Sequence, residues 1–176
     1  VKIPSNDLIQ LAIEFIIIQD NKPFYRDLLD KKFLITGGCT SEKIDAARNI
    51  TNNSSGMMGL LLAQVAKFRG AEVKFIHGPL KFNEDIGEGI KKYEIETSED
   101  LSQLIRKEIS NCDYFFMNAA VSDIKWKTDI SIKIPKSNIR KHLGNNIETV
   151  PDILRDICKS KKENQVFVGF SAFTGP

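Results

Sequence analysis

Cysteine and histidine are scarce in this sequence of 176 residues, which holds three of the former and two of the latter. The cysteines, Cys39, Cys112 and Cys158, are far apart and form no CxxC pair or Cys/His cluster. The sequence therefore supports neither a zinc site nor a disulfide framework. Free buried thiols in a reducing cytoplasm are the simplest interpretation, so we expect a cytoplasmic protein. His77 and His142 have no acid or nucleophile at a readable spacing, and we expect both to be non-catalytic.

Long apolar runs and a strong charge excess are lacking as well. The longest apolar run, Phe15 to Ile18, is far shorter than the ~20 residues that span a bilayer. No signal-peptide pattern opens the chain. The formal net charge of +2 is too small for a dedicated nucleic-acid binder. We expect neither a membrane nor a nucleic acid as partner.

Apolar residues make up 41% of the chain and charged residues 27%, which is typical of a globular domain with one core. After a helix at 8–19, buried strands alternate with helices. The predicted strands are 33–35, 72–76, 113–117 and 165–170, and the predicted helices between them are 54–68, 98–109 and 151–158. This alternation predicts a mostly parallel sheet with helices on both faces. Ligands of such folds bind at the carboxyl ends of the strands. Residues 126–146 are polar and predicted to be irregular, forming a flap or an edge strand plus loop.

Two loops after predicted strands have the composition of binding loops. Gly37 and Gly38 follow the first strand and would let backbone N–H groups approach a ligand, although tight turns use glycine in any case. Residues 52–59 lead into a helix, and Ser54, Ser55 and Gly56 at its start would suit an anion. The alternative is an ordinary serine cap, with Gly59 packing closely on the sheet.

A third loop, residues 118–123, has small residues that leave room for a planar or sugar group. Asp123 is suited to a ribose hydroxyl or a hydrated magnesium ion. The alternative is a polar turn in which Asp123 caps a helix. A basic segment follows, and one or two of its side chains would neutralise a polyphosphate unless all are simply solvated. Its members are Lys125, Lys127, Lys133, Lys136, Arg140 and Lys141.

Six short motifs, in order and spacing over residues 31–174, resemble the bacterial phosphopantothenoylcysteine synthetase family. They are the segments 35–38 (ITGG), 48–59 (RNITNNSSGMMG), 118–123 (NAAVSD), 133–136 (KIPK), 151–154 (PDIL) and 168–172 (VGFSA). The resemblance implies a Rossmann-like three-layer α/β/α fold with a mostly parallel sheet, truncated here at the C-terminus. It also implies a homodimer, within a larger homo-oligomer if the protein is bifunctional.

The resemblance implies a ligase that joins L-cysteine to 4′-phosphopantothenate through an acyl-nucleotide, an acyl-cytidylate if CTP rather than ATP is used, with magnesium. Asn52 and Lys133 would be catalytic, and Asp123 would hold the metal. The nucleotide site would comprise Asn118, Ala119, Asp123, Lys133, Pro151, Asp152, Ile153, Leu154 and Phe170. The substrate phosphate would lie on Arg48, Ser54, Ser55 and Gly56.

The resemblance also divides the chain. Residues 1–19 resemble the last helix of a preceding decarboxylase domain, 20–31 a linker, and 32–176 an incomplete ligase domain. FMN would then bind only in the absent decarboxylase half. Met57, Val150 and Phe173 depart from the residues common in the family, which puts affinity or metal handling in doubt.

Two alternatives remain open at this point. One is an inactive, truncated nucleotide-binding or dimerisation module, because fold does not establish activity. The other is a short-chain dehydrogenase, whose loops superficially match residues 36–41 and 118–121. That family needs a tyrosine four residues before a lysine, and none of Tyr25, Tyr93 and Tyr114 is so placed after the third loop.

Overall fold

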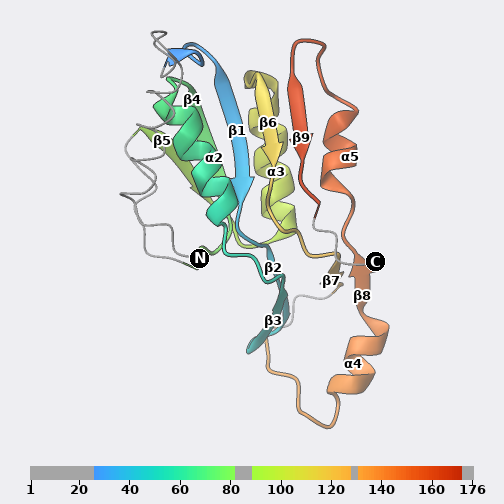
Figure 1. Ribbon diagram of the computed structural model, residues 1–176. Helices are drawn as coiled ribbons and strands as arrows, with labels where there is room; N and C mark the ends of the chain where they lie inside the picture. Colours follow the sequence, from blue (N-terminus) through green and yellow to red (C-terminus); the bar gives the residue numbers. More distant parts are fainter. Residues whose placement is uncertain (1–25, 82–88, 128–130, 172–176) are drawn as a thin grey trace, which may run out of the picture.

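The computed structural model describes residues 26–81, 89–127 and 131–171. Five strands form one sheet in the order β5-β4-β1-β6-β9 (Figure 1), and all neighbouring pairs are parallel. The strands are β1 (Lys32–Gly37), β4 (Glu72–His77), β5 (Ile90–Glu94), β6 (Tyr114–Met117) and β9 (Val166–Gly169). The predicted helix at 8–19 lies outside the described residues, as does the first half of the predicted linker, residues 20–25.

Helices cover both faces of the sheet because successive strand residues point to opposite sides. In β1, Leu34 is 0% exposed and Ile35 is 1% exposed, and the two belong to different apolar clusters. The Ile35 cluster includes Leu60 of α2 (Met57–Phe68). The Leu34 cluster includes residues of α3 (Ser98–Glu108) and α5 (Ile153–Cys158). The predicted Rossmann-like α/β fold is thereby confirmed.

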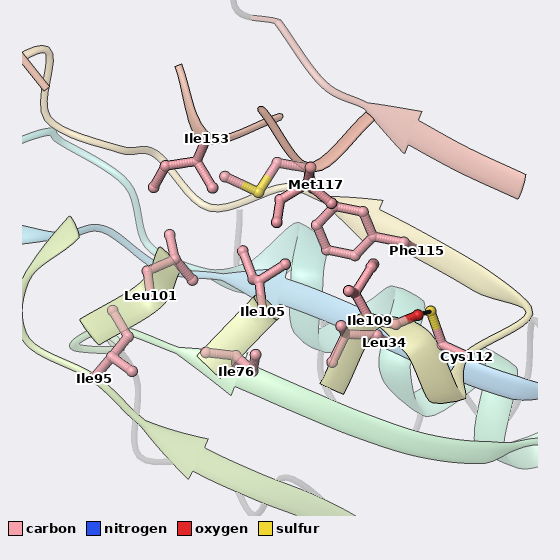
Figure 2. Packing of buried hydrophobic residues seen from close by; sticks show 11 residues of the cluster. Leu34, Ile76, Ile95, Leu101, Ile105, Ile109, Cys112, Phe115, Met117 and Ile153 are labelled. Atoms are coloured by element: carbon pink, nitrogen blue, oxygen red, sulfur yellow. Dashed lines mark hydrogen bonds between the residues drawn. The ribbon is translucent and has the colours of Figure 1, made fainter. Parts of the chain in front are cut away.

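Figure 2 shows the cluster on the α3 side. Leu101 and Ile105 of α3 pack toward Ile76 and Phe115 of the sheet. At the edge of this cluster the Cys112 thiol donates a 3.3 Å hydrogen bond to the Ile109 carbonyl, in the short helix η2 (Ile109–Asn111). Burial raises the pKa of Cys112 to about 11, so this thiol is neutral at physiological pH.

Two small antiparallel pairs lie beyond the carboxyl ends of the central strands (Figure 1). One pairs β2 (Ser41–Asp45) with β3 (Arg48–Thr51), and the other pairs β7 (Ile124–Trp126) with β8 (Ile147–Thr149). The helix α4 (Ile139–Asn145) precedes β8. Residues 126–146 were expected to form an irregular flap or an edge strand plus loop, and α4 corrects this expectation. The strands β2, β3 and β5 were not predicted.

The β2–β3 pair is fastened to the start of α3. Thr97 caps this helix, and its N–H donates to Asp100, which lowers the pKa of the Asp100 carboxyl. The buried carboxylate of Glu42 in β2 accepts a 2.7 Å hydrogen bond from the Ser98 N–H. A carboxylate at a helix N-terminus is favoured by the helix dipole. The amino end of α3 is therefore already occupied by an anion of the protein itself.

The opposite end of α3 carries an ion pair with the sheet. Lys74 of β4 and Glu108 lie 2.8 Å apart, with 21% and 11% of their side chains exposed. The Tyr93 hydroxyl also donates to Glu108 at 3.2 Å. The hydrogen bond from Lys74 holds the pKa of Glu108 below its usual value, and the same bond raises the pKa of Lys74.

Among the described residues, no helix is long and apolar enough to cross a bilayer.

Candidate functional site

The predicted binding loops meet at the carboxyl edge of the sheet. From β1 the chain passes to β4 and β5 on one side and then returns to β6 on the other. The loops after β1 and β6 therefore leave neighbouring strands in different directions, which is where ligands bind in open α/β sheets. In Figure 1 the β2–β3 and β7–β8 pairs stand at this edge.

Two threonine hydroxyls organise the third loop from the first. The Thr36 Oγ1 atom accepts hydrogen bonds from the N–H groups of Asn118 and Ala119, both at 3.0 Å. The Thr40 Oγ1 atom accepts one from the Ser122 N–H at 2.9 Å. Both threonines are 0% exposed. The backbone amides of Asn118 and Ala119 are therefore engaged within the protein, and a ligand here would meet their side chains.

The second loop places the start of α2 against the first loop. Gly56 has a left-handed backbone with φ of 81°, a conformation that favours glycine. A Cβ atom there would lie only 3.0 Å from the Gly38 nitrogen. Ser54 and Ser55 accept 3.3 Å hydrogen bonds from the N–H groups of Gly56 and Met57. No acidic residue lies in the first turn of α2, so this helix end suits an anion.

Gly59 lets α2 approach β1 and β6 closely. A Cβ atom at Gly59 would lie 2.8 Å from the Thr36 carbonyl oxygen and 3.2 Å from the Asn118 amide nitrogen. The Asn118 side chain is thus next to the first turn of α2. Close packing of Gly59 on the sheet was part of the alternative to an anion site. The structure shows both this close packing and a helix start that suits an anion.

Asn52 joins the second loop to the third. Its Nδ2 atom donates a 2.7 Å hydrogen bond to the Val121 carbonyl. The side chain was predicted to polarise a ligand carbonyl with its amide, and part of that donor capacity is used to hold the two loops together. The structure brings Asn52, the Ser54–Gly56 turn and the Asn118 loop to one place.

Lys81 is a cation of this site that the sequence did not reveal. Its N–H donates to the Ser55 carbonyl at 3.2 Å, and its ammonium group donates to the Asn53 side chain. The exposed ammonium therefore stands beside the second loop. The sequence signal for Lys81 was weak, because it consisted only of the position of this lysine shortly after the Gly78-Pro79 break at the end of β4.

Arg48 and the segment with Lys133 meet at one buried carboxylate. Asp45 accepts hydrogen bonds of 3.1 Å from both the Arg48 guanidinium and the Ile134 N–H. Burial alone would raise the pKa of Asp45. Hydrogen bonds from the Ala47 and Ile134 N–H groups and the positive charge of Arg48 outweigh this effect, so the pKa lies below its usual value. Lys133 itself is exposed.

The remaining predicted residues are more dispersed. Asp123 is exposed, and its carbonyl accepts a 2.9 Å hydrogen bond from the Val150 N–H. In the part of the chain that the structure describes, no group of three or more His, Cys, Asp or Glu side chains could hold a metal ion. Magnesium usually takes only one or two protein carboxylates, so the assignment of a magnesium ion to Asp123 stays a prediction. Phe170, after β9, is 46% exposed, and its ring centroid lies 6.4 Å from that of Phe116.

The segment 151–154 was predicted to belong to the nucleotide site. Asp152 caps α5, and its carboxylate accepts a 2.9 Å hydrogen bond from the Arg155 N–H. Ile153 is 6% exposed and packs in the Leu34 cluster. Pro151 is exposed, and Leu154 packs partly on the same cluster. The negative charge of Asp152 makes this helix end less favourable for an anion than the end of α2.

A cavity of about 640 Å³ lies elsewhere, between the end of β5 and α3. Its lining includes the acidic side chains Glu94, Glu96 and Asp100 and one cation, Lys107. None of the predicted site residues lines it. Its excess of negative charge does not suit a phosphorylated ligand, so we place the site at the three loops, where donors and cations converge.

Comparisons with known proteins agree with the fold and identify relatives. A family model described as "DNA/pantothenate metabolism flavoprotein C-terminal domain" matches residues 28–175. The coenzyme A biosynthesis bifunctional protein CoaBC of Borreliella burgdorferi is 36% identical over 160 residues, which are 91% of this chain and 40% of that protein. A crystal structure of the C-terminal domain of a CoaBC protein is 32% identical with a TM-score of 0.65, and the match covers 80% of this chain and 63% of that one.

A further relative, from an unknown prokaryotic organism, is named cysteine/cysteine sulfinic acid decarboxylase and is 31% identical over 149 residues, 85% of this chain and 41% of that protein. The chain thus spans about two fifths of the length of these curated relatives. Activities that their names give to the whole proteins do not follow for this segment.

These findings correct the activity expected from the motifs. The matching model is described as a flavoprotein domain, and the relatives are named as bifunctional coenzyme A biosynthesis proteins or, in one case, as a decarboxylase. None of these descriptions names a nucleotide-dependent phosphopantothenate–cysteine ligase. The ligase prediction is therefore withdrawn, both as a function and as an enzyme class. Neither CTP nor magnesium appears in these descriptions.

The word flavoprotein in the family description raises the question of whether the described residues fit FMN. The start of α2 suits a phosphate, so the flavin ring would need a partner elsewhere among the described residues. Phe170 is tilted by 33° relative to Phe116, so their rings do not form a parallel pair. The cavity beside α3 has an acidic lining, which disfavours the FMN phosphate. The described residues therefore do not fit FMN, and we assign it no role in this chain.

Proposed function

Since this chain belongs to the family of DNA/pantothenate metabolism flavoprotein C-terminal domains, we propose that it serves coenzyme A biosynthesis by binding a phosphorylated pantothenate derivative. The ligand class follows from the names of the relatives, which are coenzyme A biosynthesis proteins. The proposed site is the carboxyl edge of the parallel sheet, and 4′-phosphopantothenate is the proposed ligand.

The observation that carries this proposal is the contrast between three helix ends at one edge of the sheet. The start of α3 is occupied by Glu42, and the start of α5 by Asp152. The start of α2 has no acidic residue in its first turn and has Lys81 beside it. A phosphate group would be attracted to the helix dipole and the lysine there and repelled by carboxylates at the other two.

A nucleotide is the second ligand that we propose for the same edge. The side chain of Asn118 lies against α2, and the Phe170 ring is partly exposed at the end of β9. A partly exposed aromatic ring supports stacking of a planar base. Lys133 is exposed and available for a phosphate.

A homodimer is likewise a proposal, which sedimentation at several protein concentrations would test.

Calorimetric titration of the unaltered chain tests the proposed function. We expect 4′-phosphopantothenate to bind, and pantothenate, which differs only in lacking the phosphate, to bind at least about tenfold more weakly because the phosphate contacts are lost. CTP, ATP and FMN are titrated in the same way. Binding of FMN together with no binding of 4′-phosphopantothenate would overturn the proposal. Equal affinity for pantothenate would show that the start of α2 is not the phosphate site.

A further inference from the structure

Asp45 has an unusual environment for a carboxylate at the end of a short strand. Its side chain is 0% exposed, whereas that of its partner Arg48 is 33% exposed. The Oδ1 atom accepts a 2.8 Å hydrogen bond from the Ala47 N–H. The Oδ2 atom accepts 3.1 Å hydrogen bonds from the Arg48 Nη1 atom and the Ile134 N–H. A buried carboxylate is costly unless it is paired and hydrogen-bonded, and both oxygens of Asp45 are.

The Oδ2 atom joins two segments that are far apart in the sequence. Because Arg48 Nη1 and Ile134 N each lie 3.1 Å from it, they are separated by no more than twice that distance. Lys133 precedes Ile134, and Ile134 is 7% exposed, so this part of the segment is anchored. The Arg48 guanidinium is thus held near the backbone of the segment that carries the exposed Lys133 side chain.

Two neighbouring cations repel unless a negative charge lies between them or a ligand brings one. Asp45 supplies a single negative charge from a buried position. Arg48 is partly exposed and Lys133 is exposed, so both remain accessible to a ligand from solvent. Holding both before a ligand arrives reduces the entropy that is lost when the ligand binds.

We propose that Asp45 is a positioning residue that holds Arg48 and the Lys133 segment together as one subsite for a dianionic phosphate group. This inference rests on the proposed function, since the phosphate belongs to 4′-phosphopantothenate or to the nucleotide proposed for the same edge. The competing role for Asp45 is purely local, because its hydrogen bond with Ala47 also shapes the turn between β2 and β3.

The test uses Asp45→Asn, which preserves the shape of the side chain and removes its charge. We expect the affinity for 4′-phosphopantothenate or CTP, measured by calorimetry, to fall by about tenfold or more. Glu108→Gln is the matched control, because it also removes a carboxylate from a largely buried ion pair, at the far end of α3. It should leave both affinities unchanged. Thermal unfolding confirms that each variant is folded at the assay temperature.

A double-mutant cycle separates positioning from local structure. In a chain that carries Arg48→Met and Lys133→Met, we expect Asp45→Asn to change the affinity by less than about twofold, because it acts only through those two cations. An equal loss in both backgrounds would overturn the inference. Amide exchange at Ile134, measured without ligand, should accelerate in Asp45→Asn and not in Glu108→Gln.

The outcomes distinguish the two proposals. Failure of the unaltered chain to bind either phosphorylated ligand overturns the proposed function and the subsite with it. Binding by the unaltered chain with equal binding by Asp45→Asn overturns only the role of Asp45. If Asp45→Asn does not fold, Asp45→Ser replaces it, since a serine hydroxyl is compatible with the Ala47 N–H but is too short to keep both other donors.

Discussion

The side-chain amide of Asn52 donates a 2.7 Å hydrogen bond to the backbone carbonyl of Val121. These residues belong to different loops, one leading into α2 and the other leaving β6. The bond therefore closes the edge of the sheet around the position proposed for the ligand. Asn52, which was predicted to be catalytic, thus also holds two loops of the site together.

Replacing Asn52 with alanine should lower the free energy of unfolding by about 1 kcal/mol, the typical net value of one hydrogen bond. It should also weaken 4′-phosphopantothenate binding by roughly tenfold, because the loops lose their connection. Urea unfolding and calorimetry give the two quantities. Asn49→Ala is the control, since Asn49 donates to Ser41 within the β2–β3 pair. Equal losses of affinity in the two variants would contradict the role of Asn52.

Removing the charge of Lys81 should weaken binding of phosphorylated ligands while leaving the fold intact. Lys81→Met should reduce the affinity for 4′-phosphopantothenate by roughly fivefold at low salt, and the difference should shrink as salt screens the exposed charge. Lys31→Met removes an exposed charge at the opposite edge of the sheet and should have no effect. A loss that does not depend on salt would argue against an electrostatic role.

Gly59→Ala should destabilise the protein although alanine is the better helix former by about 1 kcal/mol. The added Cβ would lie 2.8 Å from the Thr36 carbonyl and 2.9 Å from the Gly37 Cα atom. We expect a net loss of about 1–3 kcal/mol, typical of overpacking, in urea unfolding. Gly144→Ala in α4 is the control, because a Cβ there meets no atom within 4 Å. A stable Gly59→Ala chain would mean that α2 can move away from β1.

The ion pair between Lys74 and Glu108 predicts a defined pH dependence. Glu108 has a lowered pKa, so its contribution is present above the usual value of 4.5 and is lost as the pH falls through the lowered value. Lys74 has a raised pKa, so its contribution is present below the usual 10.5 and is lost as the pH rises through the raised value. Glu108→Gln should cost about 1–2 kcal/mol between these limits. Unfolding at several pH values measures it, and a constant difference down to pH 2 would contradict this account.

The central strands were predictable because they are buried on both faces and therefore read as apolar runs, such as Phe33 to Ile35. β2 was not, since its buried positions include Glu42 and Asp45. Each of those carboxylates accepts a hydrogen bond from a donor far away in the sequence: Glu42 from Ser98, 56 residues on, and Asp45 from Ile134, 89 residues on. Local patterns carry no information about such distant partners.

The candidate site shows the same division. The sequence located three loops, because strand ends and glycine-rich turns are local features, and the structure brings them to one edge. Lys81 was missed because it reaches Asn53 across 28 residues and lies in no motif. The role of Asp152 as a cap of α5 was also missed, although a carboxylate one residue before a helix is a recognisable capping signal.

Glu42 works as an internal counter-ion for α3. Once a helix end holds a permanent negative charge of the protein, a visiting anion must displace a tethered competitor that never diffuses away. Two helices that begin at the same edge are thereby made unequal before any ligand arrives. A ligand with one phosphorylated end is then oriented with its phosphate toward α2, the helix whose first turn carries no acidic residue.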